Sequence, residues 1–199
     1  MFAYIKGSLE IKANNYVVID VSGIGYKIFM AGSNIDKIGD IGNNVKVYTH
    51  YYVREDNISL YGFLTDEELR MFELLISVSG IGAKSAIAML SEITPTDFAL
   101  SVISNNVTKL TKIQGIGAKT AQRIILELKD KLKTEQAIEK QDTKIQKVIA
   151  EETNYEEAIS ALQILGYNKK EIEKTLEKLD LTGLLVEDII RKALGVLGR

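Results

Sequence analysis

A short motif that occurs twice constrains this chain more than any other feature of its sequence. The segment Ser79–Ala86, SGIGAKSA, recurs 35 residues later as Gln114–Ala121, QGIGAKTA. The glycines of the two copies are the only glycines between residues 65 and 133, where apolar residues otherwise recur at helical spacing. Glycine destabilises a helix by roughly 1 kcal/mol relative to alanine. We therefore predict a tight turn between two helices at each copy.

The residue types in each copy are those of a hairpin that binds phosphate. Glycine permits positive φ and close approach of a ligand, and N–H groups at the start of the following helix form an anion site. The lysine and the hydroxyl residue after the second glycine add a positive charge and a donor. Such a site contacts the phosphodiester backbone and ignores base identity. The predicted DNA-binding residues of the hairpins are Gly80, Gly82, Lys84, Ser85, Gly115, Gly117, Lys119 and Thr120.

Other interpretations of the glycines are less favoured. Glycines also serve close helix packing, but two matched copies, each followed by lysine and a hydroxyl residue, favour a ligand. The chain has no Gly-Lys dipeptide, so a Walker A nucleotide loop is disfavoured. Neither hairpin follows a strand of a βαβ unit, which disfavours a dinucleotide site.

Charge is distributed unevenly along the chain. The 25 basic and 27 acidic residues give a net charge of −2, which by itself argues against a nucleic-acid binder. Residues 109–133 nevertheless hold seven basic and two acidic residues, whereas residues 134–199 have a net charge of −3. Lys119 and Arg123 are four residues apart and share a face of the expected helix. The local charge of +5 adds Lys112 and Arg123 to the predicted DNA-binding residues, although a solvated helix face is the ordinary meaning of such a run.

Residues 1–64 have the pattern of a small β-barrel. β-Branched and aromatic residues alternate over Tyr16–Val21, residues 25–30 and residues 45–53, and glycine and asparagine punctuate them. Five or six short strands in this length favour an OB-type barrel, because closure removes exposed edges.

Helical spacing begins after the barrel. Thr65 and Glu68 have the spacing of a capping box, and Pro95 is placed for a first helical turn. Residues 134–150 carry few apolar side chains and indicate a flexible linker, after which three short helices are expected. The predicted fold class is α+β and multi-domain. It comprises an N-terminal OB-fold barrel (residues 1–64), a central tandem helix-hairpin-helix domain (65–133), the linker (134–150) and a C-terminal three-helix, UBA-like domain (151–199).

Composition excludes several classes of protein. The chain has no cysteine, which excludes a disulfide framework, thiolate metal sites and a cysteine nucleophile. The first residues lack the pattern of a secretory signal, and no run approaches about 18 apolar residues. We expect a cytoplasmic protein without a membrane span, a metal or a cofactor.

The order of these parts resembles the RuvA family, the subunits that bind Holliday junctions in the bacterial branch-migration machinery. The resemblance covers essentially the whole chain. It is carried by the doubled hairpin, by residues 49–56 (THYYVRED) and by residues 60–63 (LYGF). It implies a non-catalytic subunit of recombination, repair and the SOS response that forms a tetramer, or two face-to-face tetramers, on an open four-way junction. The implied partners are an ATPase motor of the RuvB type and a resolvase of the RuvC type.

The resemblance assigns roles to two further groups of residues. Glu55 and Asp56 match the family's acidic pin, at the tip of a loop between strands ending near residue 53 and starting near residue 58. Carboxylates there would repel phosphates and keep strands apart, although the two residues alone indicate an ordinary charged turn. The C-terminal domain resembles the part that contacts the motor, here through Leu162, Leu165, Tyr167 and Leu194. The alternative, that such residues form the core of a small bundle, stays open.

A DNA-processing enzyme and an RNA-binding module are the competing functions. Asp130 follows the second hairpin as a glycosylase acid would, but its lysine-rich helix lacks aromatics to hold a flipped base. The acidic residues 66–68 fit a helix start better than a nuclease metal site, and His50 is the only histidine. An RNA-binding function remains, because an OB barrel and phosphate-binding hairpins also suit RNA.

Overall fold

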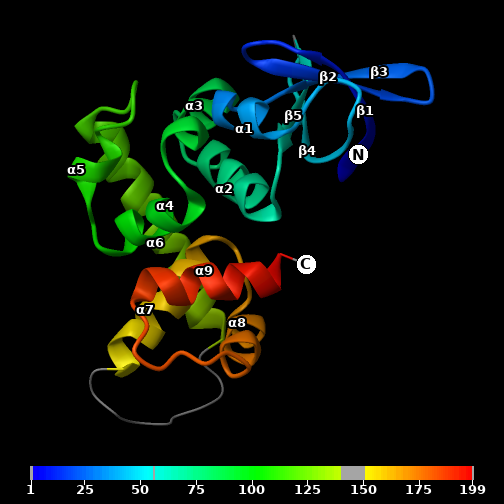
Figure 1. Ribbon diagram of the computed structural model, residues 1–199. Coiled ribbons are helices and arrows are strands. Elements are labelled where there is room, and N and C mark those ends of the chain that lie inside the picture. Colours follow the sequence, from blue (N-terminus) through cyan, green and yellow to red (C-terminus); the bar gives the residue numbers. More distant parts are fainter. Residues whose placement is uncertain (1, 56, 140–150, 199) are drawn as a thin grey trace. The chain divides into compact units, whose positions relative to one another are not determined.

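The computed structural model describes residues 2–55, 57–139 and 151–198, and it describes side chains outside residues 132–153 (Figure 1). The chain forms two compact units, one of Met1–Glu73 with Gly82–Glu92 and the other of Leu74–Ile81 with Ile93–Arg199. The elements of the first unit are β1 (Tyr4–Lys12), β2 (Tyr16–Val21), β3 (Ile24–Phe29), α1 (Gly32–Lys37), β4 (Asn44–Val53), β5 (Ile58–Phe63), most of α2 (Asp66–Ile76) and α3 (Ala83–Glu92). The second unit holds the end of α2 and then α4 (Pro95–Ile103), α5 (Val107–Leu110), α6 (Ala118–Glu139), α7 (Glu151–Ile164), α8 (Lys169–Leu176) and α9 (Val186–Leu197).

The strands of the first unit close into a barrel in the order β1-β2-β3-β5-β4. Neighbouring strands are antiparallel except β3 and β5, which run parallel where Phe29 faces Tyr61. In β2, Val17 and Ile19 are fully buried while the residues between and after them are partly exposed, as the alternation of the sequence predicts. The barrel confirms the predicted fold class at the N-terminus, although helix α1 was not predicted.

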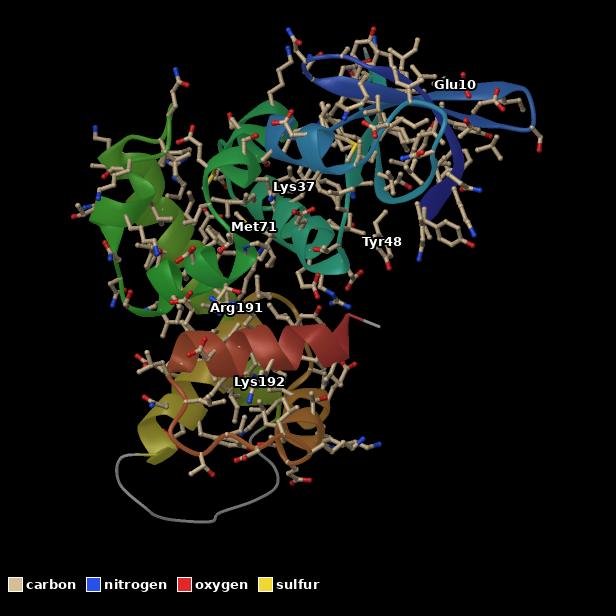
Figure 2. The ribbon with its side chains drawn as sticks, in the orientation of Figure 1. Glu10, Lys37, Tyr48, Met71, Arg191 and Lys192 are labelled. Atoms are coloured by element: carbon tan, nitrogen blue, oxygen red, sulfur yellow. The ribbon has the colours of Figure 1, made fainter. Side chains whose placement is uncertain are left out.

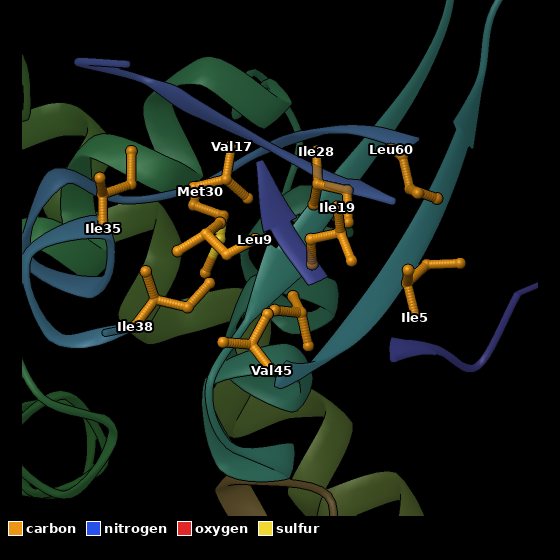
Figure 3. Packing of buried hydrophobic residues seen from close by; sticks show 11 residues of the cluster. Ile5, Leu9, Val17, Ile19, Ile28, Met30, Ile35, Ile38, Val45 and Leu60 are labelled. Atoms are coloured by element: carbon orange, nitrogen blue, oxygen red, sulfur yellow. The ribbon is translucent and has the colours of Figure 1, made fainter. Parts of the chain in front are cut away.

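Buried aliphatic side chains fill the barrel (Figure 3). The cluster consists of Ile5, Leu9, Val17, Ile19, Ile28, Met30, Ile35, Ile38, Val45, Val47 and Leu60. Gly62 in β5 faces this core, because a Cβ atom there would lie 2.4 Å from Ile28 and 2.6 Å from Val47. The barrel therefore requires glycine at this position of the LYGF segment.

The start of α2 is fixed by the predicted cap. The Glu68 N–H donates to Thr65 Oγ1 at 3.3 Å, and Glu68 Oε2 accepts from the Leu64 N–H at 3.0 Å. The same carboxylate accepts from Nδ2 of the buried Asn34 at 2.7 Å, so it also joins α2 to α1. Asp66 pairs with Arg70 at 2.7 Å. The acidic residues at this helix start are thus used in capping and in a helical ion pair, as expected.

In the second unit, α4 begins at the predicted proline and α6 ends later than predicted. Thr94 caps α4 by accepting from the Asp97 N–H at 3.1 Å, with Pro95 in the first turn. Helix α6 runs to Glu139, so residues 134–139 of the predicted linker are helical. The remainder of the predicted linker, residues 140–150, lies outside the described residues.

The C-terminal helices form a small bundle whose core absorbs the residues predicted to dock a motor. Leu162 and Leu165 are fully buried, Tyr167 is 3% exposed and Leu194 is 9% exposed. The structure thus favours the core alternative for all four. On α9, where Figure 2 labels Arg191 and Lys192, the exposed Arg191 guanidinium pairs with Glu187 and Asp188.

Two kinds of feature are absent from the described part of the chain. No single helix there is long and apolar enough to cross a membrane, and α3 with α4 reaches that length only as a pair bent by 99°. Within the same residues, no three His, Cys, Asp or Glu side chains gather in a group suited to a metal ion.

Candidate nucleic-acid interface

The two glycine motifs adopt the same backbone conformation. Gly80 has a φ of +84° and Gly115 a φ of +85°. In each copy the following isoleucine, Ile81 or Ile116, is 6% exposed, and its N–H donates at 3.1 Å to the carbonyl three residues earlier. Positive φ turns the chain back on itself, and the buried isoleucine anchors the turn. The sequence repeat is therefore a structural repeat.

Each hairpin leads directly into the start of a helix. The first hydrogen bonds of the new helices run from the Ala86 N–H to Gly82 O at 3.0 Å and from the Ala121 N–H to Gly117 O at 2.9 Å. The preceding N–H groups, on residues 83–85 and 118–120, therefore have no acceptor within their helix. Such N–H groups favour an anion through hydrogen bonds and through the helix dipole.

The polar residues of the motifs surround these N–H groups. Lys84 and Ser85 are exposed at the start of α3, Lys119 is exposed at the start of α6, and Thr120 is half-buried beside it. A Cβ atom on Gly82, Gly115 or Gly117 would meet nothing within 4 Å, so the backbone is open at these three positions. The arrangement can hold one phosphate-like anion at each hairpin through backbone N–H groups, a hydroxyl and an ammonium.

Four lysines of the basic run of residues 109–133 fall into two groups. Lys109 pairs with Asp97, and Lys129 Nζ donates to Ile103 O at 2.7 Å and to Asn105 Oδ1 at 2.8 Å. These two lysines stabilise the packing of helices. The side chains of Lys112 and Lys119 are exposed, and their ammonium groups have no hydrogen-bond or ion-pair partner among the described residues. Of these four lysines, Lys112 and Lys119 are therefore the two available to a ligand.

An ion pair between Lys109 and Asp97 lies in the helices that precede the second hairpin. The Lys109 ammonium, and after it the Thr94 hydroxyl, donate hydrogen bonds that hold the pKa of the Asp97 carboxyl below its ordinary value of 3.8, although partial burial acts in the opposite direction. The pair joins α4 to α5, the helix that enters the second hairpin.

Arg123, which the sequence predicts to contact DNA, has a partner within the chain. Its Nη1 donates to Ser79 O at 3.1 Å, just before the first hairpin. Glu127, one helical turn further along α6, accepts from the Ser79 N–H through Oε2 at 3.1 Å. Lys131, another turn along, donates to the Ser77 hydroxyl. Sequence reasoning missed Glu127, because the contact joins residues 48 positions apart and no local pattern signals it.

The loop between β4 and β5 matches the predicted position of the acidic pin. Arg54 and Asn57 exchange backbone hydrogen bonds of 2.8 and 3.4 Å, and Glu55, which follows Arg54, is exposed. Asp56 lies outside the described residues. Arg54 folds back along β4, where its Nε donates to the Tyr52 hydroxyl at 2.8 Å and its guanidinium stacks on that ring. The arginine next to Glu55 is therefore engaged with the barrel rather than with the acidic tip.

Comparison of the sequence with known protein families gives the same order of barrel, paired hairpins and C-terminal helices. Family models match at residues 1–62 (RuvA N terminal domain), 72–130 (SAM-like Helix-hairpin-helix tandem) and 153–198 (RuvA, C-terminal domain). A protein of Acetivibrio thermocellus named Holliday junction branch migration complex subunit RuvA is 53% identical over 201 residues, which cover 100% of both chains. This chain belongs to the RuvA family. Family proteins of the same name from Ruminiclostridium cellulolyticum and Clostridium perfringens strain 13 are 47% and 43% identical, over 98% and 100% of both chains.

Family membership agrees with the architecture that the sequence predicts. The three matched regions follow the order of the OB-fold barrel, the tandem helix-hairpin-helix region and the C-terminal helices. The second region contains both glycine motifs and ends within α6. The duplicated hairpin is thus part of the family's tandem motif.

Proposed function

We propose that this chain binds four-way DNA junctions and holds them for branch migration, without catalysing a reaction itself. The observation that carries the proposal is the pair of hairpins with one backbone conformation, in a chain whose full-length relatives are named as branch-migration subunits. Phosphate contacts come from the N–H groups that begin α3 and α6, from Lys84, Lys112 and Lys119, and from the hydroxyls of Ser85 and Thr120. These groups recognise backbone and not sequence, so the specificity is for the shape of the DNA.

Assembly gives the hairpins their junction shape. The proposal includes a homotetramer, or two such tetramers face to face, so that several copies of each hairpin bind the arms of one junction. Glu55 and Asp56 of each copy then form an acidic centre. Carboxylates near phosphates raise the electrostatic energy of closely spaced strands, more strongly where little water remains between them. This repulsion separates strands without breaking a bond.

A partner supplies the energy for migration. The proposal places ATP hydrolysis in a RuvB-type motor and includes a RuvC-type resolvase as a later partner, all acting in the cytoplasm where chromosomal junctions form. The residues first expected to bind the motor are buried in the core. The motor-binding surface is instead placed on two exposed apolar residues, Leu185 at the N-cap of α9 (70% exposed) and Val196 within α9 (46% exposed). Among the described residues of the C-terminal domain, they are the large apolar side chains that the fold leaves exposed and therefore available to a protein partner. Replacing both by alanine should preserve junction binding and reduce motor stimulation, and unchanged stimulation would place the motor site elsewhere.

A competition assay tests the function most simply. Labelled four-way junction bound to the full chain is challenged with unlabelled junction, linear duplex or hairpin RNA at several salt concentrations. We expect the junction to compete at least about 100-fold better than duplex or RNA, because only the junction engages all hairpins of the assembly. Equal competition by all three nucleic acids would contradict the proposal. Preferential competition by RNA would favour an RNA-binding module.

A further inference from the structure

Helix α6 holds the entrance of the first hairpin through both backbone groups of Ser79. Arg123 Nη1 donates to the Ser79 carbonyl and Glu127 Oε2 accepts from the Ser79 N–H, each at 3.1 Å. Arg123 and Glu127 are one turn apart on α6, so a single face of this helix hydrogen-bonds to both the carbonyl and the N–H of Ser79. Lys131 extends the same face to the Ser77 hydroxyl. All of these residues lie within the second compact unit.

This contact lies immediately before the residue that makes the turn. Gly80 follows Ser79 and has positive φ, and a Cβ atom on Gly80 would lie 3.2 Å from Arg123 Nη1. Side chains of α6 therefore fix the direction in which the chain enters the first hairpin. The second hairpin needs no such contact to be fixed to α6, because it continues into that helix through the chain.

We propose that Glu127 and Arg123 are positioning residues for DNA binding, which hold the backbone of Ser79 so that the entrance of the first hairpin keeps one conformation when the hairpin binds phosphate. The proposal rests on the proposed function, since it assumes that the hairpins bind phosphate. A preformed entrance lowers the conformational entropy lost when the hairpin binds, so the hydrogen bonds to Ser79 add to affinity through the backbone.

Charge and geometry predict opposite effects at Glu127, which makes the proposal testable. A carboxylate beside a phosphate-binding hairpin is unfavourable by Coulomb repulsion alone, so its neutralisation would tighten binding. Positioning depends instead on an acceptor oxygen that reaches Ser79. Glu127→Gln keeps the reach and an acceptor but removes the charge, whereas Glu127→Asp keeps the charge but shortens the side chain by one methylene.

The test measures junction affinity of the full chain for the wild type, E127Q and E127D, with exchange of the Ser79 amide hydrogen as a second readout. Positioning predicts that E127D binds about three- to fivefold more weakly and exchanges the Ser79 hydrogen faster, while E127Q stays within about twofold of the wild type. Glu157→Asp, on the exposed face of α7, is the matched control and should change neither readout.

Each other outcome overturns the inference. Unchanged affinity of E127D, even with faster Ser79 exchange, means that the hydrogen bonds to Ser79 do not set DNA affinity. A loss in E127Q as large as that in E127D means that charge and not reach is required. Lys119→Ala, measured in parallel, separates this failure from failure of the proposed function, because a loss of affinity in K119A shows that the second hairpin still binds the junction.

Discussion

The two hairpins have the same backbone and different surroundings. Both turn at a glycine with φ near +85° and both bury the next isoleucine to 6% exposure. The first is gripped from outside by Arg123 and Glu127, and it is followed by the 10-residue helix α3. The second continues into the 22-residue helix α6 and is flanked by two exposed lysines, Lys112 and Lys119.

The difference shows how one motif is used in two ways. The local sequence determines the turn in both copies, because glycine, isoleucine and glycine are shared. Tertiary contacts determine how rigidly each turn is held, and the neighbouring residues determine how much positive charge it presents. We infer that the second hairpin supplies more of the electrostatic attraction to phosphate, and that the first depends more on being held in place.

Removal of the exposed lysines should give the largest effect. We expect K112A/K119A to weaken junction binding about 10- to 50-fold at low salt. The slope of log affinity against log salt should become shallower by roughly 1.8, because two phosphate contacts are lost. K84A, in the first hairpin, should lose about three- to tenfold and roughly 0.9 of slope. The double variant K174A/K178A, which removes two exposed lysines near α8, is the control. Equal slopes for K112A/K119A and wild type would remove the asymmetry.

Replacing the turn glycines by alanine should show which hairpin is more closely surrounded by other atoms, through the loss in free energy of unfolding. Positive φ costs an L-residue about 1–2 kcal/mol, so G80A and G115A should both lower the free energy of unfolding measured in urea. G80A should lose more, because its Cβ meets Arg123 Nη1 at 3.2 Å while that of G115A meets nothing within 4 Å. G82A and G117A serve as controls in open positions. A larger loss in G115A would contradict this view of the surroundings.

A pH titration of stability should isolate the contribution of the ion pair between Lys109 and Asp97. The Lys109 hydrogen bond depresses the pKa of Asp97 below 3.8 in the folded chain, so the unfolded chain takes up the proton first as pH falls. The pair therefore contributes its full stability above about pH 5 and loses it as pH falls through the folded pKa. D97N should be less stable than wild type by at most about 1 kcal/mol at pH 7, because the pair is partly exposed. The difference should shrink toward pH 3 in urea unfolding, and a difference independent of pH would contradict the assignment.

Neutralising the loop tip should have the smallest effect on affinity, because it lies outside both hairpins. E55Q/D56N removes negative charge near the expected position of phosphates, so junction binding should stay unchanged or tighten by up to about threefold. Migration driven by the partner motor should change at the same time. Weaker junction binding would count against the acidic pin.

Sequence predicts the hairpins well because their determinants are local. The repeated glycines, the lysines and the hydroxyl residues all act within a few positions, and the helix starts follow from Thr65, Thr94 and Pro95 by capping rules. The barrel follows from alternation, which reports directly on which side chains point inward.

The remaining features depend on long-range contacts or on burial from every side. Glu127 meets Ser79 only after folding, and no periodicity marks that pair. Leu162 and Leu165 lie in a stretch of α7 and its end where residues 161–165 are all buried, so helical spacing could not tell a docking face from a core face. The basic run likewise needed the structure, since Lys109 and Lys129 are used within the chain while Lys112 and Lys119 are exposed.

Hydrogen exchange of the full chain with and without junction DNA tests the central claim most directly, because it observes the N–H groups that are proposed to bind phosphate. We predict slower exchange at residues 82–85 and 117–120 on addition of four-way junction, with exchange at residues 154–198 unchanged and with the protection lost at high salt. Protection confined to other segments, with both hairpins exchanging as in the free chain, would contradict it.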